Sequence, residues 1–367
     1  METPTPSTFI LTQNYTKTYQ YDYYVDQQFI LPSDLASSAN IFELKYSNVN
    51  FYNLDIFTED YLSHVFLLSR NNNNTMYVQN CNFHWMYYFI SSTFGYQIVI
   101  NYSKLDQSRQ TRGILTMIVS CNPTKPIINS YKVMNSYWYG NSYDEYFWLS
   151  ALASYGNVQF INNTFDMISP ASWVGFQFTS SACAHIQPNM FIFENNTVTT
   201  QNSSGIADGS GTANSFKLSL GVNVDFPDPS IRFKVSVKNN IFKQFVIRSP
   251  ILDVSSNLQQ TEIIFENNTI EGLYLDPDSN LQNAIIEINN LQQQSYFTIK
   301  YINTVLFENN MFKDLIMTQN KILSVSNAQS VLIQNINASN ISKIMFFNHK
   351  FSFLEFILLD INSKFKY

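Results

Sequence analysis

The residues of this chain that could do chemistry are scattered acids, histidines and cysteines. Paired carboxylates can serve as general acid and base or bind calcium. Four such pairs occur, and three of them lie beside Pro or Ser, where acids in solvated turns are the ordinary case. The pairs are Glu59 with Asp60, Asp144 with Glu145, Asp225 with Asp228, and Asp276 with Asp278. We therefore predict no catalytic residues.

Metal and cofactor sites are not expected either. The 4 histidines are scattered, and the closest pairing with a cysteine is that of His185, two residues after Cys183. One such pair is weak support for a metal site. The chain also lacks a glycine-rich phosphate loop and a serine-nucleophile elbow.

The 3 cysteines are widely spaced and do not form a disulfide framework. A Cys121–Cys183 or a Cys81–Cys121 bridge stays open in an oxidising compartment. Cys81 stands where repeats of a phrase described below carry Asn or Ile, so we expect a small buried side chain there.

Aromatic residues supply the candidate ligand surface. The chain has 23 Tyr and 31 Phe, and a tyrosine-rich stretch holds more aromatic rings than a small structural unit can bury. Exposed rings stack on sugars and anchor protein partners. The candidate ligand face consists of Tyr137, Trp138, Tyr139, Tyr143 and Trp148.

A short repeated phrase indicates the elements that would position these residues. It consists of an apolar residue, one variable residue, two asparagines, one further residue and then an apolar one. Copies of it occupy 160–165, 193–198, 237–242, 265–270 and 307–312. Such repetition is typical of stacked units, each too small to bury its apolar face alone.

Each of the five phrases, and the related corner at Asn335, follows a second apolar segment with strand-like alternation. These segments are 147–153, 174–178, 216–224, 251–254, 284–288 and 322–325. The distance from corner to corner varies between 26 and 44 residues, which a coil of short strands absorbs in its loops and a helical repeat does not. The pattern predicts an all-β, right-handed parallel β-helix of roughly eight to ten coils, with little helix.

Strand alternation gives a hypothesis for the Asn-Asn corner. Extended through Phe265, Glu266 and Asn267, it places the first asparagine inward and leaves the second free to take the left-handed conformation. The first asparagines would then stack as a structural ladder, as amides do in other stacked strands. Its members are Asn162, Asn195, Asn239, Asn267, Asn309 and Asn335.

The repeat also predicts how the chain is divided. We expect an irregular N-terminal segment over 1–39 and the β-helix over 40–345, with irregular coils to about residue 145 and regular coils after it. Residues 346–367 would form a C-terminal cap or a truncated coil. Glu194, Glu266 and Glu308 should form an outward acidic row that Lys238 interrupts.

The Phe-x-x-Asn phrase at 160–163, 193–196, 265–268 and 307–310 resembles the repeat of pectin-lyase-like right-handed β-helix proteins. It looks most like the Asn-rich β-helix ectodomains of surface proteins in ciliated protozoa, and it shares half of the repeat of chlamydial polymorphic outer-membrane proteins. The resemblance implies an extracellular, membrane-tethered protein. It carries no catalytic residue to this chain.

The composition excludes some classes of binding partner. The formal charge is −6 with only 21 Lys and Arg, which argues against a nucleic-acid or anionic-membrane surface. No secretory leader and no segment long enough to span a membrane is evident. Glycosylation acceptors (Asn-x-Ser/Thr) in the expected loops, at Asn73 and Asn202, could carry glycans if the chain is secreted, whereas those at the corners are expected to face inward.

These features lead to two functional hypotheses. The first is a non-enzymatic structural or adhesion scaffold at a cell surface or outside the cell, and the chain could be a fragment of a larger membrane-tethered protein. The second is a carbohydrate-binding or carbohydrate-active β-helix protein. The expected partners are carbohydrates or cell-surface proteins, and no cofactor is expected.

Overall fold

The computed structural model is an all-β solenoid, and the part of the chain that it describes contains no helix. The described residues are the strands given below and the corners that join them. Side chains are described over 50–55, 75–84, 97–105, 130–138, 157–166, 190–199, 232–243, 260–272, 304–314 and 330–339, and at 218, 220, 251–254, 256 and 323.

Strands before the corners form one row, the approach row. It consists of β2 (Thr16–Tyr19), β5 (Asn48–Tyr52), β8 (Asn74–Gln79), β11 (Tyr96–Asn101), β14 (Ser130–Met134), β17 (Asn157–Ile161), β20 (Asn189–Glu194), β23 (Arg232–Lys238), β27 (Gln260–Glu266) and β31 (Ile302–Glu308).

Strands after the corners form the exit row. It consists of β3 (Gln28–Leu31), β6 (Asp55–Thr58), β9 (Asn82–His84), β12 (Lys104–Asp106), β15 (Tyr137–Asn141), β18 (Thr164–Ile168), β21 (Thr197–Thr199), β24 (Ile241–Lys243), β28 (Thr269–Glu271) and β32 (Met311–Leu315). The long strand β34 (Ser330–Ile341) runs through its corner and continues both rows, and β35 (Leu359–Lys364) pairs with it.

A third row returns the chain to the next coil. It consists of β1 (Phe9–Leu11), β4 (Asn40–Leu44), β7 (His64–Leu68), β10 (Tyr88–Ser92), β13 (Leu115–Met117), β16 (Phe147–Ala151), β19 (Ser172–Phe178), β22 (Phe216–Val222), β26 (Leu252–Ser256), β30 (Ala284–Asn290) and β33 (Lys321–Ser326). A small extra pair joins β25 (Val246–Ile247) to β29 (Tyr274–Leu275).

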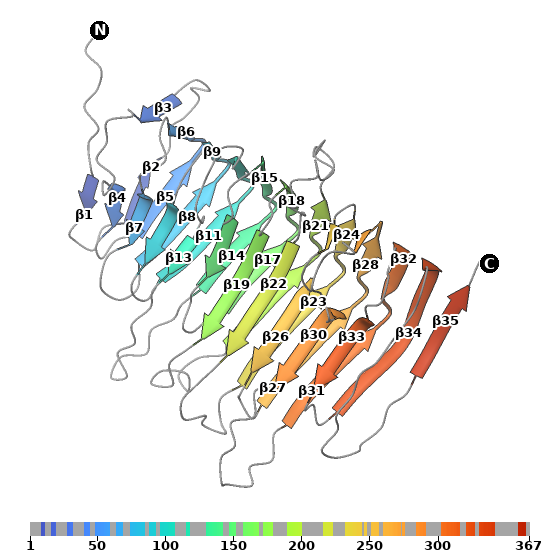
Figure 1. Cartoon of the computed structure of the whole chain (residues 1–367). Helices are drawn as coiled ribbons and strands as arrows, with labels where there is room; N and C mark the ends of the chain where they lie inside the picture. Colours follow the sequence, from blue (N-terminus) through green and yellow to red (C-terminus); the bar gives the residue numbers. More distant parts are fainter. Residues whose placement is uncertain are drawn as a thin grey trace.

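Pairing between coils is parallel throughout the described strands. Each strand pairs with the strand in the same row one coil away, as β23 does with β27 and β27 with β31. The approach and exit rows together make a 22-stranded sheet, and the third row makes sheets of 5 and 6 strands. Figure 1 shows these strands lying side by side from the N-terminal to the C-terminal end of the stack. The predicted parallel β-helix is confirmed.

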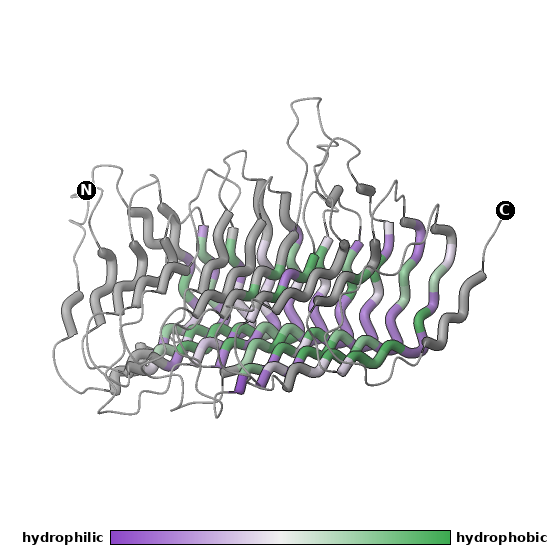
Figure 2. The backbone as a smooth tube through the Cα atoms, turned by 60° about the horizontal axis from the view of Figure 1, so that its bottom comes forward, coloured by the Kyte–Doolittle hydropathy of each residue, from purple (hydrophilic) through white to green (hydrophobic). Residues whose placement is uncertain are grey.

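The core lies inside the coil, where alternate residues of the strands stack on their counterparts in the next coil. Phe265 and Phe307 are both buried, and their rings stack 5.3 Å apart. Rings of different rows also meet, since Phe165 of β18 stacks on Phe193 of β20 at 5.6 Å. Figure 2 shows the apolar positions as green bands that continue from coil to coil. Each ring contact stabilises the fold by about 0.5–1.5 kcal/mol beyond the stabilisation that comes from burying the rings.

The return strands expected before each corner are present as β16, β19, β22, β26, β30 and β33, which confirms that part of the pattern. Pairing extends past both expected limits of the β-helix. Strands β1, β2 and β3 lie within 1–39 and pair with β4, β5 and β6, while β35 pairs with β34 beyond residue 345. Among the described residues there is no helix of the length and apolar character needed to cross a membrane.

Candidate functional site

The corner between the approach and exit rows is the most regular feature of the molecule. At each corner that the structure describes, from Asn53 to Asn335, one residue takes a positive φ between 49° and 56°. This is the left-handed region, which asparagine tolerates better than other residues with a side chain. The corner residues are Asn53, Asn80, Tyr102, Asn135, Asn162, Asn195, Asn239, Asn267, Asn309 and Asn335.

The residue after each left-handed position points into the coil. In the regular coils it is the second asparagine of the phrase, and all of these side chains are at most 2% exposed. We call them the buried ladder, which consists of Asn163, Asn196, Asn240, Asn268 and Asn310.

The ladder amides bond from coil to coil, and Asn240 shows the full pattern, with bonds to the coils on both sides. Its Oδ1 accepts hydrogen bonds from the backbone N–H of Asn196 at 2.8 Å and from Asn196 Nδ2 at 3.2 Å. Its Nδ2 donates to the Phe193 carbonyl at 2.8 Å and to Asn268 Oδ1 at 2.9 Å. All four bonding positions of the amide are therefore used, and the ladder holds neighbouring coils in one register.

The expected orientation of the asparagine pair was wrong. The first asparagines, predicted as the inward ladder, are the left-handed residues and are exposed at Asn162, Asn195, Asn239, Asn267, Asn309 and Asn335. The second asparagines are buried. Strand alternation does not continue through the corner, because the left-handed residue turns the chain and delays the next inward side chain by one position.

The sequence did contain a signal for this orientation. At less regular corners the second residue is Leu54, Cys81 or Ile336, and each of these is buried. An apolar residue in the second position, after a single asparagine, marks that position as the inward one.

The first asparagines also bond to one another in places, on the outside of the corner. Asn80 Nδ2 donates to Asn53 Oδ1 at 2.7 Å, and Asn335 Nδ2 donates to Asn309 Oδ1 at 2.9 Å. Asn162 Nδ2 donates to Asn135 Oδ1 at 2.6 Å. These amides are more exposed than those of the buried ladder, so each bond competes with water and contributes less.

Hydroxyl groups continue the buried ladder toward the N-terminus. Ser136 N–H donates to Asn163 Oδ1 at 3.0 Å, and Ser103 N–H donates to Ser136 Oγ at 3.1 Å. Cys81 N–H donates to Ser103 Oγ at 3.2 Å. Cys81 is buried at its corner, as predicted, and burial raises the pKa of its thiol to about 11.

Tyr102 is an exception among the corner residues. Its φ is 49°, and its side chain is 58% exposed. A bulky residue in this conformation is strained by about 1–2 kcal/mol. Asn80 and Asn135 hold the same corner position on the neighbouring coils, because Asn80 N–H donates to the Asn101 carbonyl and Tyr102 N–H donates to the Met134 carbonyl. The result is one exposed aromatic ring within a line of amides, which sequence reasoning missed.

One member of the predicted ligand face in the tyrosine-rich stretch is a core residue. Trp138 is fully buried and stacks near Phe165, with ring centroids 5.9 Å apart. Its neighbour Tyr137 lies on the opposite side of β15 and donates from its hydroxyl to Asp166 at 3.1 Å. Trp138 was therefore wrongly assigned to the ligand face. The side chains of Tyr139, Tyr143 and Trp148 lie outside the described residues.

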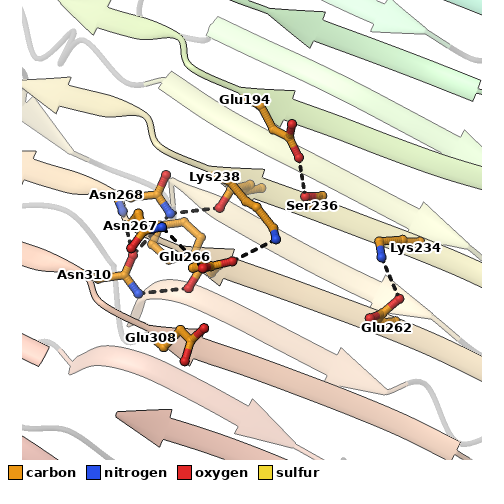
Figure 3. A network of polar contacts seen from close by, with 12 residues as sticks. Glu194, Lys234, Ser236, Lys238, Glu262, Glu266, Asn267, Asn268, Glu308 and Asn310 are labelled. Carbon is orange, nitrogen blue, oxygen red and sulfur yellow. Dashed lines mark hydrogen bonds and ion pairs between the residues drawn. The ribbon is translucent and has the colours of Figure 1, made fainter. Parts of the chain in front are cut away.

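The outward acidic row next to the corner is interrupted as expected. Lys238 lies between Glu194 and Glu266 in the pairing of β20, β23 and β27, and its Nζ is 2.8 Å from Glu266 (Figure 3). Glu194 accepts a hydrogen bond from Ser236 at 2.7 Å, and Glu308 accepts one from Gln334. The row is thus a set of local polar pairs.

Further ion pairs join neighbouring coils. Lys234 Nζ lies 3.0 Å from Glu262, and Lys313 Nζ lies 2.7 Å from Glu271. The hydrogen bond and the charge of Glu271 raise the pKa of Lys313. Strands β23 and β27 therefore meet with basic residues facing acidic ones.

Other sequence candidates lie outside the described residues. These are the four carboxylate pairs, Cys121, Cys183, His185 and the glycosylation candidates Asn73 and Asn202. Within the described part, no three His, Cys, Asp or Glu side chains gather as a metal site. His84 does pair with Asp55, at 3.1 Å across neighbouring coils.

Comparison with known proteins adds no relative: no protein-family model, no curated protein and no solved structure matches this chain significantly.

Proposed function

We propose that this chain is a non-enzymatic structural or adhesion scaffold, displayed at a cell surface or outside the cell. The observation that carries the proposal is the buried ladder from Asn163 to Asn310, in which the side-chain amides bond coil to coil. Such a stack is a stiff support, and its variable loops are free to differ. The side chains that repeat serve stacking, and this favours a scaffold.

Two further features support an extracellular location. Only 13% of the residues are charged, so the polar surface relies on amides and hydroxyls. The Phe-x-x-Asn phrase resembles the repeat of Asn-rich, pectin-lyase-like surface proteins of ciliated protozoa. Partners in this setting would be carbohydrates or other cell-surface proteins.

The test of location is labelling of the full-length gene product in the cells that make it. An antibody against the chain should label intact cells, and protease treatment of intact cells should remove that signal. Labelling that needs permeabilised cells would contradict the proposal.

Tyr102 supports carbohydrate binding as a second candidate function. Its exposed ring can stack on a sugar, and corner amides at Asn80 and Asn135 can bond to sugar hydroxyls. The strain of its backbone favours a role beyond folding, since asparagine would occupy this corner at lower cost.

A glycan array with wild-type protein and two variants tests this candidate. Tyr102→Phe keeps the ring and should keep binding. Tyr102→Asn should lose binding and raise the free energy of unfolding by about 1 kcal/mol, because asparagine relieves the backbone strain. Equal array binding by wild type and Tyr102→Asn, or no binding by wild type, would rule this site out.

A further inference from the structure

The corner geometry changes which asparagines can carry a modification. Three corners continue into threonine and so form Asn-x-Thr acceptors for N-linked glycans, at Asn162, Asn195 and Asn267. In each acceptor the modified residue is the first asparagine, which is exposed, and the middle residue belongs to the buried ladder. The corner thus directs the acceptor amide outward and keeps the ladder amide inside.

Neighbouring coils limit which of the three acceptors can be occupied together. Asn162 and Asn195 lie on adjacent coils, since Asn162 N–H donates to the Glu194 carbonyl at 2.9 Å. Adjacent strands are about 4.8 Å apart, which leaves little room for two glycans side by side. The amide of Asn162 is also tied to the neighbouring coil, because its Nδ2 donates to Asn135 at 2.6 Å, whereas Asn267 Nδ2 donates only to the adjacent Glu266, at 3.3 Å.

Asn195 and Asn267 have more space. Asn195 N–H donates to the Lys238 carbonyl and Asn239 N–H donates to the Glu266 carbonyl, so the coil of Asn239 separates these two corners. The two acceptors are therefore roughly 10 Å apart along the edge. Asn239, the corner residue between them, is not a glycosylation acceptor, because Ile241 stands where Thr197 and Thr269 stand in the neighbouring coils.

We propose that Asn195 and Asn267 carry N-linked glycans on the corner edge of the solenoid. In this reaction the Asn Nδ2 forms a bond to C1 of an oligosaccharide and gives up one proton. The bond from C1 to a lipid diphosphate carrier breaks, and the lipid diphosphate leaves. The inference rests on the proposed extracellular location for its natural occurrence, and the site geometry can be tested separately.

The glycans would have a structural consequence. They would cover the corner edge between the approach and exit rows and leave the third row and the loops for contact with partners. A glycan on this edge would also prevent lateral association there.

The first experiment sends the full chain through the secretory pathway of a eukaryotic cell by means of an added secretion signal. Peptide mass spectrometry of the secreted, folded protein should find glycans at Asn195 and Asn267. Thr197→Ala and Thr269→Ala should each remove one glycan and leave the left-handed asparagine and the ladder in place. Secreted protein with both sites bare would overturn the proposal.

A matched gain-of-site variant tests whether the exposed corner position as such accepts a glycan. Ile241→Thr creates an Asn-x-Thr acceptor that begins at Asn239, and Ile241 is 39% exposed, so its replacement should not disturb the core. We expect a glycan at Asn239 with reduced occupancy at Asn195 or Asn267, because adjacent coils compete for space. A folded variant with no glycan at Asn239 would contradict the geometric argument. Far-ultraviolet circular dichroism checks that each variant keeps the fold.

The second experiment uses the protein from its natural source, treated with an endoglycosidase that removes N-linked glycans. A downward shift on a gel, mapped to both asparagines by mass spectrometry, is the expected result. Protein that is found at the cell surface but carries no glycan at either asparagine would contradict the proposed glycosylation and leave the proposed function intact. Intracellular protein with both sites bare would contradict the proposed function as well.

Discussion

An asparagine in the buried ladder has four hydrogen-bonding positions and no access to water. The neighbouring coils fill these positions with backbone and amide groups, as they do for Asn240 and Asn268. A satisfied hydrogen bond contributes about 0.5–1.5 kcal/mol, but a buried group that loses its partner costs about 1–3 kcal/mol. The two asparagines of one corner should therefore respond very differently to mutation.

Asn268→Ala should lower the free energy of unfolding by about 2–5 kcal/mol, because it leaves the Asn240 N–H and the Val237 carbonyl without their partners. Asn267→Gly is the matched control at the neighbouring position. Glycine adopts a positive φ without strain, so this variant should lose less than about 1 kcal/mol. Urea unfolding measures both, and equal losses would contradict the assignment of the two roles.

Cys81 gives a prediction on pH. The pKa of its thiol is about 11 in the folded chain and 9.0 ordinarily, because burial disfavours the thiolate. The unfolded thiol therefore ionises first, so the stability that the neutral buried thiol contributes is complete below pH 9 and is lost as the pH rises toward 11. Between pH 9 and pH 11, the free energy of unfolding of the wild type should therefore fall by about 2 kcal/mol more than that of Cys81→Ala.

Unfolding by urea at the two ends of this pH range measures the difference between wild type and Cys81→Ala. A thiol reagent adds a second readout, since Cys81 should resist alkylation in the folded protein at pH 8 and react once the protein is unfolded. Alkylation of the folded protein at Cys81, mapped by mass spectrometry, would contradict the burial.

At the scale of the strand, charge pairs distinguish one coil from the next. The apolar and asparagine positions of β20, β23 and β27 are so alike that they would also fit a strand in the wrong coil. Lys238 meets a glutamate on either side, but Lys234 faces Glu262 in β27 and Met190 in β20, so the two ion pairs form together only when β23 lies against β27. Ion pairs of this kind contribute modestly to stability and more to the choice of neighbour.

Lys238→Glu tests this role. It places a third carboxylate between Glu194 and Glu266 and should lower the free energy of unfolding by about 1 kcal/mol at low salt. Lys238→Met removes the charge without adding repulsion, so it should lower the free energy of unfolding by less than Lys238→Glu does. High salt should reduce the difference between the two variants, because it screens exposed charges. A difference that does not change with salt would assign the loss to packing.

At the scale of the whole molecule, each coil contacts only the coils beside it. Stability in such a solenoid is approximately a sum over coils and their interfaces. A complete coil is thus the unit that can be removed, whereas part of a coil is not.

Deletion of residues 197–240 removes one coil from corner to corner and joins Asn196 to Ile241. The new neighbour of Asn196 is Asn268, so the buried ladder stays continuous, and the protein should fold with a β-type circular dichroism spectrum and reduced stability. Deletion of 223–240 removes only β23 and its corner, and it should prevent cooperative folding. Loss of folding in the first variant, or a native-like second one, would contradict the modular view.

The repeated phrase, the alternation of the return segments and the variable spacing were enough to predict a parallel β-helix. These features are local, and each points to short strands that must stack to bury their apolar faces. The burial of Cys81 and the interruption of the acidic row by Lys238 also followed from position in the repeat. The pairing of β1 to β3 was not predicted, because residues 1–39 carry little of the phrase.

The orientation of each asparagine pair depended on the three-dimensional corner. A left-handed residue changes the direction of every side chain after it, and alternation counted along the sequence misses that change. The same turn made Trp138 a core residue and Tyr102 an exposed one. It also turned the acceptors at Asn195 and Asn267 outward, because the left-handed corner residue projects into solvent while the next residue bonds inside the coil.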